Sequence, residues 1–77
     1  GNIDDYMIKN KISNRQKVIL RYMAQARTDT NIAIELGLSQ NTIKYHKKEL
    51  FKKLGVGTSI EAVVKALKLN IITLDEI

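Results

Sequence analysis

The residues best suited to bind a ligand lie between Ser39 and Gly55. This stretch holds five lysines, a histidine and a tyrosine against one acid, Glu49. Ammonium groups bind phosphate through charge-assisted hydrogen bonds, and lysine also donates to guanine O6 and N7 in the DNA major groove. Acids gather instead near the two ends of the chain. A positive field confined to one segment indicates a polyanionic partner, with nucleic acid favoured over an anionic membrane.

Enzyme chemistry is not expected from these residues. His46 is the sole histidine and there is no cysteine, so no metal site can be assembled. We find no nucleophile–base pair, paired carboxylates or glycine-rich phosphate loop, and therefore expect neither catalytic residues nor a cofactor. His46 lies at the edge of an apolar helix face, where we expect it to pack or bond locally; a phosphate contact is the alternative.

The composition indicates one small globular domain. The chain has 77 residues, a net charge of +5 and 44% hydrophobic residues, which is too apolar for a disordered chain. No apolar run approaches the roughly 20 residues that span a bilayer, so we expect a cytoplasmic protein with no membrane partner. The chain begins with Gly1 rather than methionine, so we expect a processed end or a piece of a longer protein.

The elements that must position the lysines are helices. The expected fold is all-α, a compact four-helix domain over residues 12–77, preceded at 1–11 by a linker or N-terminal extension with at most one helical turn. The predicted helices cover residues 14–26, 29–36, 40–54 and 59–69. Ser13 and Gln16 form a capping box at the start of the first helix. In the tail, three apolar side chains are expected to pack on the core: Ile71, Ile72 and Leu74.

The second and third predicted helices are joined tightly enough to form a helix-turn-helix. Thr28 or Asp29 caps the second helix, Gly37 ends it in the left-handed conformation, and Ser39 caps the third. Only two residues separate the end of the second helix from Ser39, so the second and third helices must cross at a steep angle. A helix presented in this way fits the DNA major groove, with its N-terminal half near the base edges.

At about 100° per residue, the helix over 40–54 divides into two faces. The apolar face consists of Ile43, Leu50, Phe51 and Leu54. The opposite face carries the expected base contacts: Asn41, Lys44, Tyr45 and Lys48. Lysine-rich faces are often merely solvated, but a place on the second helix of a helix-turn-helix favours DNA binding. The amides at the start of this helix, from Gln40 to Thr42, are expected to be free for phosphate.

The helix over 59–69 is apolar around more than half of its circumference, which exceeds what a monomer needs. Packing under the other helices accounts for Ala62, Val63 and Ala66. Three residues are left on an adjacent strip and suit a two-fold dimer contact: Ile60, Val64 and Leu67. The alternative is that the N-terminal segment or the tail covers this strip.

The blocks "LGLSQNTIKYH", "KKLGV" and "EAV" occur in an order that resembles the DNA-binding domain of the LuxR/GerE family, found also in NarL-like response regulators. The resemblance covers residues 12–72. It implies a four-helix domain whose third helix enters the major groove and whose fourth helix forms a dimer. By position it places base contacts at Lys44, Tyr45 and Lys48, and backbone contacts at Thr28 to Asn31, Thr42 and Lys52. The full set of predicted phosphate contacts is Thr28, Thr30, Asn31, Gln40, Thr42, Lys47 and Lys52.

Three departures from the family pattern affect the expected geometry. A glutamate is usual at Gln16, so the capping box survives but an ion pair from it is lost. Glycine is usual at Ala26, so that helix end is expected to have a different shape. An apolar residue is usual at Lys47, whose stem must lie on the core while its ammonium reaches solvent.

The function predicted from these features is sequence-specific DNA binding by the effector domain of a bacterial-type transcription regulator, acting as a dimer on a two-fold site. Double-stranded DNA and a second copy of the chain are the expected partners, with a missing receiver or sensor domain as a further one. Two alternatives stay open: a sigma-factor-like promoter-binding region within RNA polymerase, and a basic module that binds an acidic protein.

Overall fold

The structure, a computed structural model, describes residues 3–77. Five α-helices follow one another: α1 (Ile3–Lys11), α2 (Asn14–Ala24), α3 (Asp29–Leu36), α4 (Gln40–Leu54) and α5 (Ser59–Lys68). A short 3-10 helix, η1 (Leu74–Glu76), closes the chain. No strand occurs in this range, so the predicted all-α class and the helices α2 to α5 are confirmed, with one additional helix at the N-terminus.

The N-terminal segment differs from the prediction. The sequence predicts at most one helical turn in residues 1–11, whereas α1 has nine helical residues; residues 1 and 2 lie outside the described range. Acids in the first turn of α1 and lysines in its last turn complement the helix dipole. The helix also packs against α4, with Ile8 touching the core and Ile12 buried just after it. This long-range packing gives the helix support that its own sequence does not supply.

Local capping chemistry fixes the ends of the remaining helices. The Ser13 hydroxyl accepts from the Gln16 amide at 3.1 Å, and the Ser13 amide donates to Gln16 Oε1 at 3.0 Å, which confirms the capping box. The N-caps of α3, α4 and α5 are Thr28, Ser39 and Thr58. Gly37 and Gly55 end α3 and α4 at φ values of 66° and 69°, a left-handed conformation that glycine adopts without a steric penalty.

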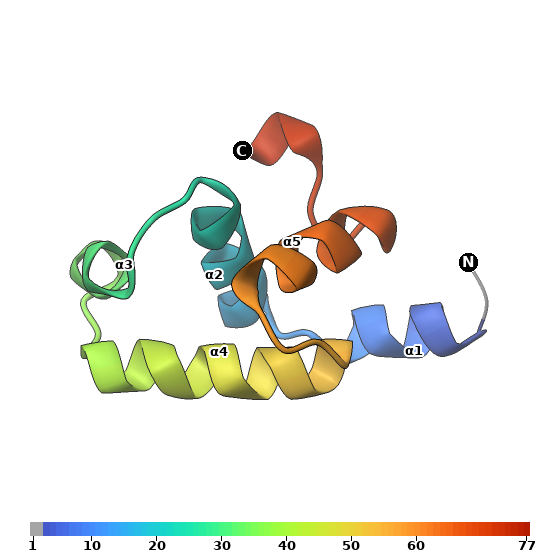
Figure 1. Cartoon of the computed structure of the whole chain (residues 1–77), viewed down its shortest axis with the longest axis horizontal. Helices are drawn as coiled ribbons and strands as arrows, with labels where there is room; N and C mark the ends of the chain where they lie inside the picture. The colour runs from blue at the N-terminus through green and yellow to red at the C-terminus, as the bar shows by residue number, and fades with distance from the viewer. Residues whose placement is uncertain (1–2) are drawn as a thin grey trace.

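The core lies where α2, α3 and α5 pack against α4, and α3 contributes the buried Ile32 and Ala33. The side chains of α4 that were predicted to face inward do so: Ile43, Leu50 and Leu54 are fully buried, and Phe51 packs against them. From α5, Ala62 and Ala66 are fully buried, because small side chains let this helix approach α2 and α4 closely. Figure 1 shows α4 along the lower edge of the molecule, with α2 and α5 above it and α1 beyond its C-terminal end. None of the helices in residues 3–77 is long and apolar enough to cross a membrane.

The C-terminal tail folds back on α2. As predicted, Ile71 and Ile72 are buried, but the prediction for Leu74 is wrong, because its side chain is 74% exposed. The reason is η1, in which the Glu76 carboxylate accepts from the Thr73 amide at 2.8 Å and pairs with Arg21 of α2. The Thr73 amide, followed by Arg21, lowers the pKa of Glu76 below its ordinary value. These contacts anchor the tail through polar groups and leave Leu74 outside the core.

Candidate nucleic-acid interface

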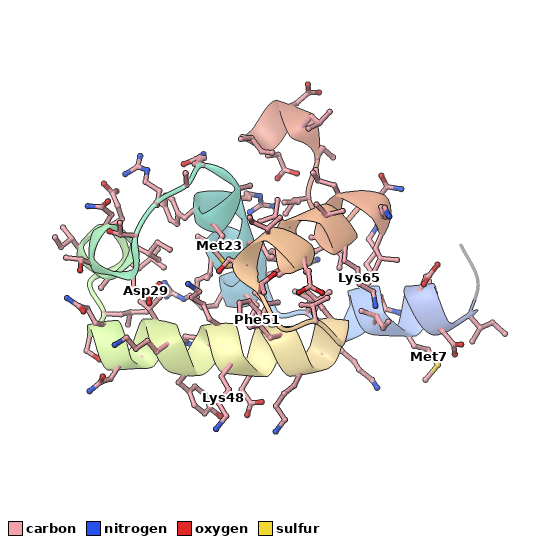
Figure 2. The ribbon with its side chains drawn as sticks, viewed as in Figure 1. Met7, Met23, Asp29, Lys48, Phe51 and Lys65 are labelled. Carbon is pink, nitrogen blue, oxygen red and sulfur yellow. The ribbon has the colours of Figure 1, made fainter. Side chains whose placement is uncertain are left out.

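The outer face of α4 protrudes from the rest of the domain. Its apolar residues fix the roll of the helix about its axis, so the residues on the opposite side must project away from the core. Figure 2 shows Lys48 directed away from the other helices, whereas Phe51 lies on the side of α4 that faces them. A helix held by its whole inner face and open along its outer face can enter a groove without unfolding.

All four predicted base-contact residues are exposed on this outer face. The Tyr45 side chain is 59% exposed and meets the half-buried His46 edge to face, with ring centroids 5.9 Å apart. Asn41, Lys44 and Lys48 are also exposed. Within residues 3–77 no carboxylate pairs with Lys44 or Lys48. Two unpaired ammonium groups one helical turn apart therefore form the positive centre of the face.

The start of α4 differs in one detail from the expectation of three free amides. The Thr42 amide donates to the Ser39 hydroxyl at 3.1 Å, and the two hydroxyls are 2.9 Å apart. This is the usual role of an N-cap residue, which satisfies the amide three positions later. The Gln40 and Asn41 amides belong to the first turn and have no partner within the helix. Gln40 is exposed and Thr42 is half-buried.

The start of α3 places three predicted phosphate contacts together at the surface. Thr28, Thr30 and Asn31 are all exposed. Thr28 caps the helix, and its hydroxyl accepts from the Asn31 amide at 3.1 Å. The first turn of a helix carries a partial positive charge, which favours an approaching phosphate. One residue of this turn, Asp29, is negative and has a partner of its own on α4.

The five lysines of α4 divide into two groups. Lys44, Lys48 and Lys52 point outward; the Lys52 side chain is 71% exposed, with its ammonium 3.9 Å from Glu49 of the same helix. The other two, Lys47 and Lys53, reach inward to other elements.

Lys47 was expected to hold its stem on the core and its ammonium in solvent, but the ammonium pairs with Asp29 instead. Lys53 was not distinguished from the outward lysines by the sequence. Lys47 Nζ lies 2.9 Å from Asp29 Oδ1, with side-chain exposures of 21% and 26%. Lys53 Nζ donates to the Lys11 carbonyl and to Gln16 Oε1, each at 2.9 Å. The sequence could have indicated this behaviour, because both lysines lie at or beside inward-facing positions of the helix. A lysine in such a position needs a hydrogen-bond acceptor, which another element of the fold must supply.

The three residues predicted to form a dimer lie on α5, well away from the outer face of α4. Ile60 is 78% exposed and Val64 is 44% exposed, whereas Leu67 is half-buried and packs partly against the core. Ile60 and Val64 also line an open groove between α5 and α1, which Asp5 lines from the α1 side. Neither α1 nor the tail covers Ile60, so this part of the apolar strip stays exposed in the single chain.

Comparison with known proteins identifies the family. The sequence profile of the bacterial regulatory proteins of the luxR family matches residues 10–66, which include the whole of α2, α3 and α4 and most of α5. This chain belongs to the luxR family. It is 35% identical over 69 residues to the uncharacterized response regulatory protein YgeK of Escherichia coli (strain K12), covering 90% of this chain and 47% of that protein.

Other LuxR-family relatives carry names that refer to regulation or to fimbriae. The quorum sensing-dependent transcriptional regulator RpaR of Rhodopseudomonas palustris is 35% identical over 66 residues, which cover 86% of this chain and 27% of RpaR. The fimbriae Z protein of Salmonella typhimurium is 40% identical over 52 residues, which cover 68% of this chain and 25% of that protein. The chain thus spans less than half the length of the relatives it matches.

Two departures from the LuxR pattern can be read in the structure. At Gln16 the amide oxygen still accepts from Lys53, so a neutral hydrogen-bond acceptor stands where a glutamate would form an ion pair. Ala26 was expected to give a different helix end, but it adopts the left-handed conformation that glycine favours, with φ of 60°. The backbone shape is therefore retained, at the cost of steric strain on the alanine Cβ.

Proposed function

We propose that this LuxR-family chain is the DNA-binding domain of a transcription regulator and that it binds a two-fold DNA site as a dimer. The observation that supports this most directly is the outer face of α4, where Lys44 and Lys48 project without a carboxylate partner among the described residues. A protruding basic helix suits the major groove, where lysine donates to guanine O6 and N7. The family match and the regulators among the relatives support the same function.

In this proposal the residues of the interface have two kinds of role. Lys44 and Lys48 read guanine, Asn41 pairs with adenine, and Tyr45 packs against a thymine methyl group or bonds a phosphate. The exposed residues at the helix starts and Lys52 hold the backbone and fix the register without reading sequence. The proposed phosphate contacts are Thr28, Thr30, Asn31, Gln40, Thr42 and Lys52. Lys47, also predicted as a phosphate contact, is paired with Asp29 in the free domain.

The dimer contact is proposed for the apolar strip of α5. Ile60 and Val64 are exposed on a helix whose other apolar residues are packed, and burying the same strip of two copies removes apolar area from water. Leu67 lies at the inner edge of this contact. Two domains related in this way would place their α4 helices on half-sites about 10 bp apart.

We also propose that a further domain controls this one in the complete protein. The relatives matched here are longer than the chain, which covers 47% of YgeK and 27% of RpaR. A receiver or sensor domain would supply the switch. The domain itself offers α1 and the groove beside α5 as surfaces through which such control could act.

Selection of bound duplexes from a random DNA pool tests the proposed function. Lys44→Ala or Lys48→Ala should weaken binding by about 1–3 kcal/mol and relax the base preference at one position, whereas Lys52→Ala should weaken all sequences alike. Equal, sequence-independent losses for all three variants would remove the base-reading role. A selected site with a single half would count against the dimer.

Two other functions predict different outcomes. The LuxR match disfavours a sigma-factor-like region, which would co-purify with RNA polymerase in a pull-down. A basic module for an acidic protein would bind that protein, and its DNA binding would lack base preference. Specific DNA binding with a steep dependence of log K on log salt would favour the proposal over both.

A further inference from the structure

The Asp29–Lys47 ion pair lies at the edge of the proposed DNA-binding surface. Lys47 Nζ and Asp29 Oδ1 are 2.9 Å apart and join the middle of α4 to the first turn of α3. Asp29 lies on the side of α3 that faces α4 (Figure 2). The side chains are 21% and 26% exposed, so the pair is only partly screened by water.

The neighbours of this pair are residues proposed to contact phosphate. Thr28 and Thr30 flank Asp29 in the chain, and both are exposed at the start of α3. Lys47 precedes Lys48, which projects from the outer face. A carboxylate at this point has two effects on an approaching phosphate. It repels the phosphate directly, and it occupies an ammonium group that could otherwise donate to it.

We propose that Asp29 is an internal competitor of the DNA backbone for Lys47. The inference rests on the proposed DNA-binding function and adds to it a residue that limits affinity. In the free protein the carboxylate neutralises Lys47, so the domain meets DNA with one phosphate-binding cation fewer than its sequence suggests. Lys47 becomes available to phosphate only when the pair breaks. Asp29 thereby keeps sequence-independent affinity low while Lys44 and Lys48 retain base contacts.

The test compares Asp29→Asn with a charge-matched control. Glu35→Gln makes the same change in charge on the same helix, but the partner of Glu35 is Arg27, at 3.8 Å, rather than Lys47, and its side chain is 50% exposed. Binding to one selected duplex is measured between 50 and 200 mM salt. Asp29→Asn should bind about fivefold more tightly at the lower salt, with the slope of log K against log salt steeper by about 0.9. Glu35→Gln should leave the slope unchanged.

A double variant shows whether the gain passes through Lys47. Asp29→Asn combined with Lys47→Met should return the affinity to within about twofold of the wild type, with the wild-type slope, because the released ammonium is then absent. Circular dichroism checks that each variant folds. If Asp29→Asn does not fold, Asp29→Ser replaces it, because serine is also tolerated near the start of a helix.

The outcomes separate this inference from the proposed function. Unchanged or weaker binding of the folded Asp29 variant, an equal gain from Glu35→Gln, or a gain that persists in the double variant would overturn the role of Asp29. In each of these cases the proposed function still stands if the wild type binds DNA specifically and Lys48→Ala weakens that binding. Absence of specific, salt-dependent binding by the wild type would instead contradict the proposed function itself.

Discussion

Lys48 and Lys53 provide a charge-matched test of which face of α4 binds DNA. Each carries one positive charge on the same helix, and they lie five positions apart, which turns their side chains about 140° apart. Lys48 is exposed and has no carboxylate partner in the part of the chain that the structure describes, whereas Lys53 donates to the Lys11 carbonyl and to Gln16 Oε1. Replacing either lysine by alanine lowers the net charge equally, so differences between the variants report position.

The expected magnitudes follow from these contacts. Within residues 3–77, Lys48→Ala breaks no hydrogen bond or ion pair. Loss of one base contact should raise the Kd by roughly 5- to 150-fold, equivalent to about 1–3 kcal/mol. Lys53→Ala removes two hydrogen bonds from an ammonium group, but Gln16 Oε1 keeps the Ser13 amide as a donor. The net loss of stability should be about 1–2 kcal/mol, with a fall in Tm of roughly 4–8 °C for each kcal/mol.

The assays are binding to a selected duplex at 150 mM salt and thermal unfolding followed by circular dichroism. At this salt the screening length is about 8 Å, so Lys53→Ala should change the Kd by less than about twofold. The reasoning is refuted if Lys53→Ala weakens DNA binding as much as Lys48→Ala does, because net charge would then decide affinity. It is refuted equally if Lys48→Ala leaves the Kd unchanged.

Three further substitutions test the packing and the dimer. Gln16→Glu should stabilise the domain by about 0.5–1.5 kcal/mol, because its carboxylate gains an ion pair with Lys53. The pair lowers the folded-state pKa, so the gain should be present above the unfolded pKa of about 4.3 and disappear in melts at lower pH. Ala26→Gly should raise the free energy of unfolding in urea by about 1 kcal/mol, because glycine adopts a φ of 60° without steric strain, at some cost in unfolded-state entropy. A lower free energy of unfolding would show that the alanine is not strained at this position. Ile60→Asp should halve the number of protein copies bound to a two-fold DNA site, as measured by sedimentation. Ile34 is 73% exposed on α3, and Ile34→Asp should leave this number unchanged. Equal effects of the two substitutions would argue against α5 as the dimer contact.

Local chemistry made most of the fold predictable. The capping box of Ser13 with Gln16 and the left-handed stop at Gly37 involve residues within three or four positions of one another, so short spacing carries the information. The same holds for the two faces of α4, because Ile43 and Leu50 share one side of the helix at a fixed period. These features define the outer face of α4 as a candidate site before any tertiary contact is known.

Features that depend on distant segments were missed. Helix α1 packs against α4, far away in sequence, and its own short polar sequence gives no strong helix signal. Leu74 is held out of the core by an anchor between Glu76 and Arg21, 55 positions apart. Lys47 forms an ion pair with Asp29, 18 positions away in the sequence. In each case the partner is chosen by the tertiary structure, which periodicity and spacing within one helix do not encode.

Titration of the ¹⁵N-labelled domain with a selected duplex tests the central claim most directly. The account predicts that the largest amide shifts fall on the outer face of α4, at Asn41, Lys44, Tyr45 and Lys48, and at the start of α3. Shifts centred on α1 or on the inner contacts of Lys53, with the outer face of α4 unchanged under saturating DNA, would contradict it.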